Sequence, residues 1–177
     1  MSSNKPLNIN NNISDVVIAI GGNLAYGGAS VKEVLDAAVA RFPEHGLKLV
    51  KRSGLWRSHA WPDPTKPDYL NGVVLVRTVL SAREVMEALL AIETAFGRRR
   101  GAANAPRTLD LDLIDYGGEI RNEPGLILPH PRAAERRFVM GPLAEIDPDW
   151  RHPALGETAA ALATRAGVGG DARPLAP

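Results

Sequence analysis

Cysteine is absent from the 177-residue chain, and aromatic residues make up only 5% of it. The lack of thiols excludes disulfide bonds, thiolate chemistry and cysteine-based zinc sites, and it fits a reducing compartment. No apolar run is long enough to span a membrane, and the polar, Asn-rich first residues lack the hydrophobic segment of a signal peptide. We therefore expect a cytoplasmic protein that has no membrane partner.

The chain also lacks an excess of positive or negative charge, since its formal net charge is only +1. Such a chain has no global basic field that attracts nucleic acid, and few aromatic side chains that stack on bases. A sheet that binds single-stranded RNA is the alternative here, but we expect no nucleic-acid partner. Hydrophobic residues make up 45% of the chain, which is enough for the core of one ordinary globular domain.

Hydrophobic periodicity and helix-capping patterns divide the chain into strands and helices. Strands are expected at residues 15–20, 47–56, 69–80 and 108–112. Two amphipathic helices begin with capping boxes, formed by Ser30 with Glu33 and by Ser81 with Glu84. This order predicts the β-α-β-β-α-β core of an α+β, ferredoxin-like fold, with an antiparallel sheet and flanking helices on one face. A C-terminal α-rich extension follows, with an Ala-rich helix at residues 158–166.

The predicted core forms a single domain from residue 15 to residue 166. Residues 1–14 are expected to be a disordered extension, and residues 167–177 a C-terminal tail whose last residues are frayed. A loop with three prolines, residues 57–68, joins the second and third strands. A loop of this length inside a compact domain is more often functional than a simple connection.

Two aspartates alternate with leucines in the segment from residue 108 to residue 112. In a strand, Asp110 and Asp112 point to one face while the leucines point to the other and are buried. Paired carboxylates suit Mg²⁺, which prefers them together with phosphate oxygens and water. Several arginines precede the pair in sequence, namely Arg98, Arg99, Arg100 and Arg107. Arginines beside paired carboxylates suit a phosphate ester that arrives with a divalent cation, although a solvated strand face explains the same pattern.

A second group of residues suits a flat heterocyclic ring. Tyr69 and Asn71 open the third strand, where they offer an aromatic face and an amide that both donates and accepts hydrogen bonds. Phe138 is suited to the other side of such a slot, although ordinary strand packing also explains Tyr69. His130 lies between two prolines with arginines nearby, and it is either structural or phosphate-binding.

Together, these segments resemble the 6-hydroxymethyl-7,8-dihydropterin pyrophosphokinase family of folate biosynthesis, from about residue 17 to about residue 153. The resemblance rests on the order and spacing of AIGGNL at 19–24, YLN at 69–71, IE at 92–93, GR at 97–98, PRTLDLD at 106–112 and LPHPR at 128–132, followed by Arg136 and Phe138. It implies ATP-dependent transfer of a pyrophosphoryl group to the hydroxymethyl oxygen of the pterin, with release of AMP.

The resemblance also implies roles for individual residues. Asp110 and Asp112 would hold two Mg²⁺ ions, and Arg98 and Arg107 would bind ATP and act on its phosphates during transfer. The further ATP-binding positions are Glu93, Arg100, His130 and Arg136. The pterin-binding positions are Ser58, Trp61, Tyr69, Asn71 and Phe138. Ala103 and Asn104 depart from the family pattern, in which Arg and Trp side chains contact ATP.

We therefore expect a monomer whose partners are the small-molecule substrates ATP and 6-hydroxymethyl-7,8-dihydropterin. One alternative is a metal-dependent phosphohydrolase with the same site geometry, which would release inorganic phosphate or a nucleoside diphosphate rather than AMP. Another is a catalytically weak family member that serves in partner interactions. The intact carboxylates and arginines argue against that second alternative.

Overall fold

The computed structural model describes residues 12–60, 62–99 and 107–176. Its strands are β1 (Ser14–Gly22), β2 (Lys48–Arg52), β3 (Trp56–Ser58), β4 (Tyr69–Thr78), β5 (Asp110–Tyr116), β6 (Arg121–Glu123), β7 (Leu126–Leu128) and β8 (Arg173–Pro174). Its helices are α1 (Val31–Ala40), α2 (Ala82–Ala95), α3 (Arg137–Ile146) and α4 (Ala159–Arg165), with short 3₁₀ helices at Phe42–His45 and Ala133–Glu135.

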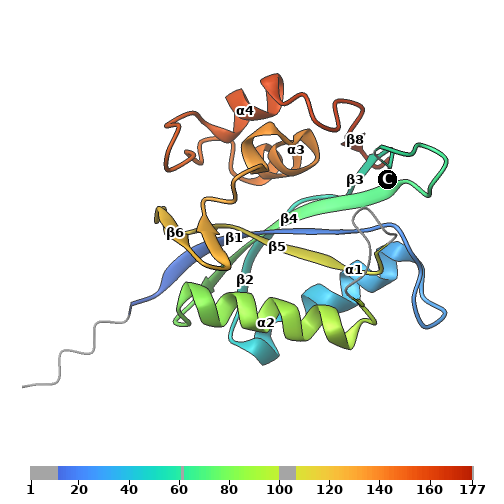
Figure 1. Ribbon diagram of the computed structural model, residues 1–177, viewed down its shortest axis with the longest axis horizontal. Coiled ribbons are helices and arrows are strands. Elements are labelled where there is room, and N and C mark those ends of the chain that lie inside the picture. Colours follow the sequence, from blue (N-terminus) through green and yellow to red (C-terminus); the bar gives the residue numbers. More distant parts are fainter. Residues whose placement is uncertain (1–11, 61, 100–106, 177) are drawn as a thin grey trace, which may run out of the picture.

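The main sheet has the strand order β5-β1-β4-β3-β8, and β2 also pairs with β4. Every pair in it is antiparallel, while β6 and β7 form a separate hairpin. The succession β1-α1-β2-β4-α2-β5 confirms the predicted β-α-β-β-α-β core with its antiparallel sheet and flanking helices (Figure 1).

The strand expected at residues 47–56 is divided into β2 and β3. The interruption begins at Ser53, whose hydroxyl oxygen accepts the hydrogen bond of the Val73 backbone N–H at 2.9 Å. A side chain therefore takes the place of a backbone carbonyl in the ladder, and regular pairing resumes only at Trp56, opposite Asn71.

Both predicted capping boxes are confirmed. The Glu33 carboxylate accepts the backbone N–H of Ser30 at 2.8 Å, and the Glu84 carboxylate accepts that of Ser81 at 2.7 Å. Each serine hydroxyl in turn accepts the N–H of its glutamate. These bonds satisfy backbone donors that the first turn of a helix leaves without partners, and so they fix where α1 and α2 begin.

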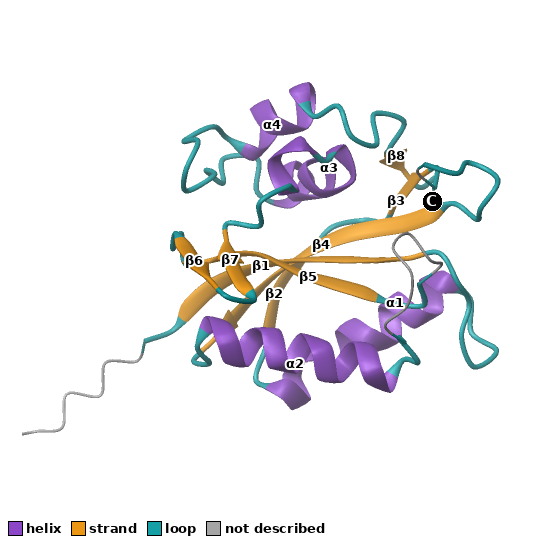
Figure 2. Ribbon diagram, in the orientation of Figure 1, coloured by secondary structure: helices purple, strands orange, loops and turns teal. Residues whose placement is uncertain are grey.

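Helices cover both faces of the sheet (Figure 2). Residues such as Ile18, Leu35 and Leu111 form the core under α1 and α2. Val17, Val73 and others form a second core with α3 and α4. The expectation that helices cover one face is therefore wrong, because the α-rich extension folds back over the other. The continuous apolar run of β1 is typical of a strand that is buried on both sides.

The segment after α4 is ordered against the sheet. Arg173 and Pro174 pair with β3 as β8, the Leu175 N–H donates to the Leu55 carbonyl at 2.7 Å, and Ala172 is 2% exposed. The prediction of fraying is therefore wrong for the described residues of the tail. No helix in the described ranges has the length and apolar character needed to cross a membrane.

A core substitution in α3 tests whether this helix covers the second face of the sheet. Leu143 is fully buried, so Leu143→Ala is expected to lower the free energy of unfolding by about 2 to 5 kcal/mol in a urea titration. Leu155 is 50% exposed, and Leu155→Ala should change it by less than about 0.5 kcal/mol. Equal effects of the two changes would contradict the packing described.

Candidate active site

The register of three adjacent strands positions the candidate site. Gly21 of β1 lies opposite Asn71 of β4 on one side and opposite Asp110 of β5 on the other. Two residues away along β1, Ala19 is paired with Asp112. A β-carbon on Gly21 would lie 2.9 Å from the Asn71 Oδ1 atom. Glycine therefore leaves room for the Asn71 amide, a requirement that the sequence analysis did not find.

The alternation predicted for the aspartate strand is confirmed. Leu109, Leu111 and Leu113 are buried in the core under α1 and α2, while Asp110 and Asp112 line a cavity on the opposite face. The strand itself begins at Asp110 rather than at residue 108.

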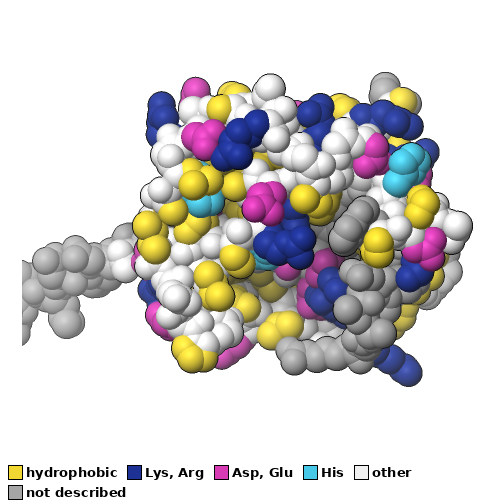
Figure 3. Space-filling model, turned by 45° about the horizontal axis from the view of Figure 1, so that its top comes forward, with side chains coloured by type: hydrophobic (Ala, Val, Ile, Leu, Met, Phe, Trp, Pro, Cys, Tyr) yellow, Lys and Arg dark blue, Asp and Glu magenta, His cyan; other side chains and the backbone are white. Residues whose placement is uncertain are grey.

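The cavity has a volume of about 820 Å³ and lies at this end of the sheet. It brings together two groups of residues that were predicted separately. The first group consists of Arg107, Asp110, Asp112 and Arg136, and the second of Ser58, Tyr69, Asn71 and Phe138. On the surface view, basic and acidic side chains gather next to one another near the middle of one face (Figure 3).

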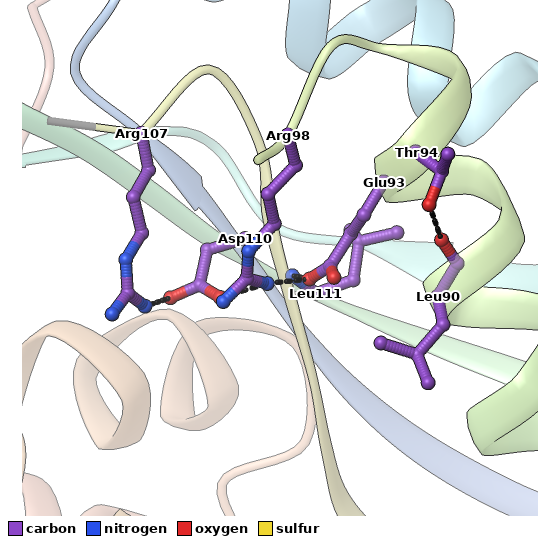
Figure 4. Close-up of polar contacts among 7 residues, drawn as sticks. All are labelled: Leu90, Glu93, Thr94, Arg98, Arg107, Asp110 and Leu111. Atoms are coloured by element: carbon purple, nitrogen blue, oxygen red, sulfur yellow. Dashed lines mark hydrogen bonds and ion pairs between the residues drawn. The ribbon is translucent and has the colours of Figure 1, made fainter. Parts of the chain in front are cut away.

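Two arginines hold the Asp110 carboxylate from different sides (Figure 4). Arg98, which follows α2, donates from Nη1 to Asp110 Oδ1 at 2.8 Å, and Arg107, which precedes β5, donates to Oδ2 at 2.9 Å. The Arg98 Nη1 atom also donates to the Glu93 carboxylate. Asp110 is thus held by two arginines that both precede the aspartate strand in the sequence.

Glu93 lies behind this arrangement and is only 2% exposed. Its Oε1 atom accepts the Leu111 backbone N–H at 2.7 Å in addition to the Arg98 bond. Burial raises the pKa of Glu93 to about 7, against the lowering effect of these two partners. With Arg98, Glu93 lines a smaller hollow of about 220 Å³ rather than the large cavity. Its contact with ATP stays a prediction, whereas its hold on Arg98 and β5 is observed.

Burial and the neighbouring charge of Asp110 raise the pKa of Asp112 to about 6, while the Arg136 guanidinium lowers it. A bound cation would favour both ionised carboxylates. The described residues contain no group of three or more His, Asp or Glu side chains suited to a metal ion. Asp110 and Asp112 offer two carboxylates to the cavity, which fits Mg²⁺, because this ion completes its coordination with phosphate oxygens and water.

The second group of residues presents both flat and polar surfaces to the cavity. The Asn71 amide donates to the Ser58 hydroxyl at 3.1 Å, and these residues are 8% and 4% exposed. Tyr69 comes from β4 and Phe138 from α3, so two aromatic rings line the cavity from different elements. The Arg136 guanidinium lies 5.7 Å from the centre of the Phe138 ring, a cation–π contact that joins the two groups of residues.

His130 is not among the described residues that line the cavity. Its Nδ1 atom accepts the Arg132 backbone N–H at 3.2 Å. The backbone N–H of His130 donates to the Ile114 carbonyl at 2.8 Å. Burial and the charge of Arg136 lower the pKa of the imidazole, so the neutral form is favoured. The predicted site residues Trp61 and Arg100 lie outside the described ranges, as do Ala103 and Asn104.

Asn23 is a site residue that the sequence analysis missed. It is 3% exposed, and its Oδ1 atom accepts the Arg107 N–H at 2.9 Å while its Nδ2 atom donates to the Pro67 carbonyl at 3.1 Å. It therefore ties the end of β1 to the entry of β5 and to the Pro-rich loop. Nothing in the sequence around Asn23 indicates such distant partners.

Comparisons with known proteins agree with this geometry. A family model described as 7,8-dihydro-6-hydroxymethylpterin-pyrophosphokinase (HPPK) matches residues 17–148. A 2-amino-4-hydroxy-6-hydroxymethyldihydropteridine pyrophosphokinase of Synechocystis sp. is 43% identical over 143 residues, which are 80% of this chain and 71% of the relative. Its counterpart from Pseudomonas aeruginosa is 38% identical over 141 residues, or 80% of this chain and 85% of the relative.

Solved structures share the fold. A crystal structure of wild-type Plasmodium falciparum HPPK-DHPS with SDX-DHP superimposes with a TM-score of 0.62 at 12% identity, over 85% of this chain. The matched region is 43% of that longer chain. At this identity the likeness concerns the α+β architecture alone.

The buried Glu93 predicts a pH dependence of stability in the absence of nucleotide and divalent cation. Because its pKa rises from 4.5 to about 7 on folding, the folded protein keeps a proton that the unfolded chain releases in this range. The stability that this proton contributes is fully present below pH 4.5 and is lost as the pH rises through about 7. In the wild type we expect the free energy of unfolding to fall by on the order of 1 to 3 kcal/mol over this pH range. Glu93→Gln should remove this decrease, because glutamine does not titrate.

Urea titrations at a series of pH values from pH 4.5 to about pH 8 measure how the free energy of unfolding changes as Glu93 titrates. Glu87→Gln, at an exposed position of the same helix, is the matched control and should follow the wild type. If the Glu93→Gln protein and the wild type lost stability with pH in parallel, Glu93 would not carry the raised pKa.

Proposed function

Because this chain belongs to the 7,8-dihydro-6-hydroxymethylpterin-pyrophosphokinase family, we propose that it transfers a pyrophosphoryl group from ATP to the hydroxymethyl oxygen of 6-hydroxymethyl-7,8-dihydropterin and releases AMP. The observation that carries the proposal is the shared cavity, in which the carboxylate–arginine cluster and the Asn71–Ser58 pair face the same space. All of these residues come from one chain, so a monomer is sufficient.

The acceptor side of the cavity is suited to a pterin. Tyr69 and Phe138 offer aromatic faces on which a flat bicyclic ring stacks. The Asn71 amide, which the Ser58 hydroxyl orients, presents hydrogen-bonding atoms to the ring edge. Because both polar residues are buried, a ring that left them without partners would bind poorly.

The phosphate side supplies guanidinium groups that can orient a phosphate group. Arg98, Arg107 and Arg136 all carry guanidinium groups close to Asp110 or Asp112, and such groups bind phosphate oxygens in a fixed geometry. Asp110 and Asp112 would hold two Mg²⁺ ions, which neutralise charge on the transferring group and orient the reacting oxygens. The protein itself contributes positioning and electrostatic stabilisation, which are the main requirements of phosphoryl transfer.

A metal-dependent phosphohydrolase is the second candidate that the Asp110–Asp112 pair allows. A hydrolase transfers the group to water and needs no shaped acceptor pocket. The buried Asn71–Ser58 pair and the aromatic rings beside it therefore favour a transferase.

A single assay separates the two candidates. The protein is incubated with ATP, Mg²⁺ and 6-hydroxymethyl-7,8-dihydropterin, and the nucleotide products are separated by chromatography. The transferase produces AMP only when the pterin is present. Release of phosphate or ADP at the same rate without pterin would instead establish the hydrolase and overturn the proposal.

Asp112→Asn tests the contribution of the second carboxylate with almost no change in shape. Loss of its charge should lower kcat by at least about a hundredfold, because an anchor for charge in the transition state is removed. The fold should remain intact, since burial already disfavours the ionised form of this side chain. Asp149→Asn, at an exposed position after α3, is the control. Turnover near that of the wild type in Asp112→Asn would mean that the cation binds elsewhere.

A further inference from the structure

The wall of the cavity includes residues 167–171, which open the predicted C-terminal tail. Val168 anchors the segment to the start of α3, because its carbonyl accepts the Arg137 N–H at 2.9 Å and its N–H donates to the Glu135 carbonyl at 3.0 Å. Ala172 closes the segment with an N–H bond to the Gly169 carbonyl at 2.9 Å. Backbone hydrogen bonds thus fix the segment in the cavity wall.

Gly169 lies directly against the Phe138 ring. Its φ is +68°, and a β-carbon there would be 2.5 Å from the Phe138 Cδ1 atom. Real β-carbons do not approach another atom this closely, so any side chain at this position displaces either the ring or the segment. Because Gly169 has no side chain, its backbone can pack directly against the Phe138 ring and support the ring in its position.

Asp171 ties the same segment to the start of the Pro-rich loop. Its Oδ2 atom accepts the His59 backbone N–H at 2.6 Å. The His59 ring is in turn bonded through Nδ1 to the Asp68 carboxylate at 2.9 Å. Because His59 directly follows Ser58, the Asp171 contact fixes the backbone beside the residue that orients the Asn71 amide.

We propose that Gly169 and Asp171 are positioning residues for the acceptor substrate: they hold Phe138 and the His59 backbone in place and so set the affinity for the pterin. This inference rests on the function proposed above. The contacts described for residues 167–171 reach the acceptor side and, through the pairing of Val168 with Arg136, the start of α3, but none of them involves Arg98, Arg107 or Asp110. The effect of the segment should therefore fall more strongly on pterin binding than on ATP binding.

Gly169→Ala tests the support of Phe138, and Gly156→Ala is its matched control. Gly156 has a similar φ of +71°, but a β-carbon there would meet no atom within 4 Å. Both variants therefore carry the same backbone strain, and only one pushes on Phe138. We expect Gly169→Ala to raise the KM for the pterin by roughly ten- to a hundredfold, with a much smaller change in the KM for ATP and with Gly156→Ala like the wild type.

Asp171→Ala tests the second contact without a change in backbone conformation. The KM for the pterin should rise by roughly three- to tenfold, as expected for the loss of one hydrogen bond to a charged acceptor. Asp171→Asn keeps an acceptor oxygen and should restore most of the affinity, which a general loss of stability would not allow. Asp149→Ala is the control for removal of an exposed carboxylate.

Calorimetric titration of the pterin, with a non-hydrolysable ATP analogue present, separates this inference from the proposed function. A wild type that binds the pterin but releases no AMP would overturn the proposed function and leave the inference standing, and one that binds no pterin would overturn both. The inference fails if Asp171→Ala binds the pterin like the wild type, or if the KM for ATP rises in parallel. If Gly169→Ala does not fold, the Asp171 pair of variants decides the outcome.

Discussion

A buried carboxylate stabilised by one arginine and one backbone N–H is the interaction on which the candidate site depends. Glu93 loses solvation on folding, and its bonds to Arg98 and to the Leu111 N–H partly offset that cost. Those same bonds join α2 to β5 and bring Arg98 to Asp110. The surrounding cluster pairs acidic with basic side chains, so it has little net charge to offer a polyphosphate. In the proposed function, cations that accompany the nucleotide would share the neutralisation of its charge with the arginines, which agrees with a carboxylate pair suited to Mg²⁺.

The spacing of a β-sheet then fixes how far apart the two groups of cavity residues lie. Asn71, Gly21 and Asp110 occupy one row across three neighbouring strands. Since adjacent strands lie about 5 Å apart, the acceptor side and the phosphate side are separated by about 10 Å at the backbone. The middle position of this row carries no side chain. A ligand can therefore lie across β1 and reach both sides, whereas a larger residue at position 21 would collide with the Asn71 amide.

Local patterns predicted the parts of the protein that local physics decides. Capping boxes identified the starts of α1 and α2, and the alternation around Asp110 and Asp112 identified the face that each side chain occupies. The site features that were missed depend on contacts between segments far apart in the sequence. Asn23 bonds to Arg107 and Pro67, and the glycine-rich segment around Gly169 has no periodic pattern that reveals its position. The family resemblance proposed the roles of Tyr69 and Phe138, but it did not indicate what holds them in place.

The two sides of the cavity therefore differ in how they are assembled. The phosphate side is built mainly by α2, β5 and the residues next to them, so its geometry follows from one local unit and the Glu93 bonds within it. The acceptor side needs β4, α3 and the C-terminal segment to close on one another, with Phe138 packed against Gly169 and His59 bonded to Asp171. Closure of distant segments costs more chain entropy than local contacts do. Weaker packing of α3 on the sheet should accordingly loosen the acceptor side before the phosphate side, because the acceptor side relies on the helix for a wall, whereas the phosphate side takes from it only Arg136 at its start.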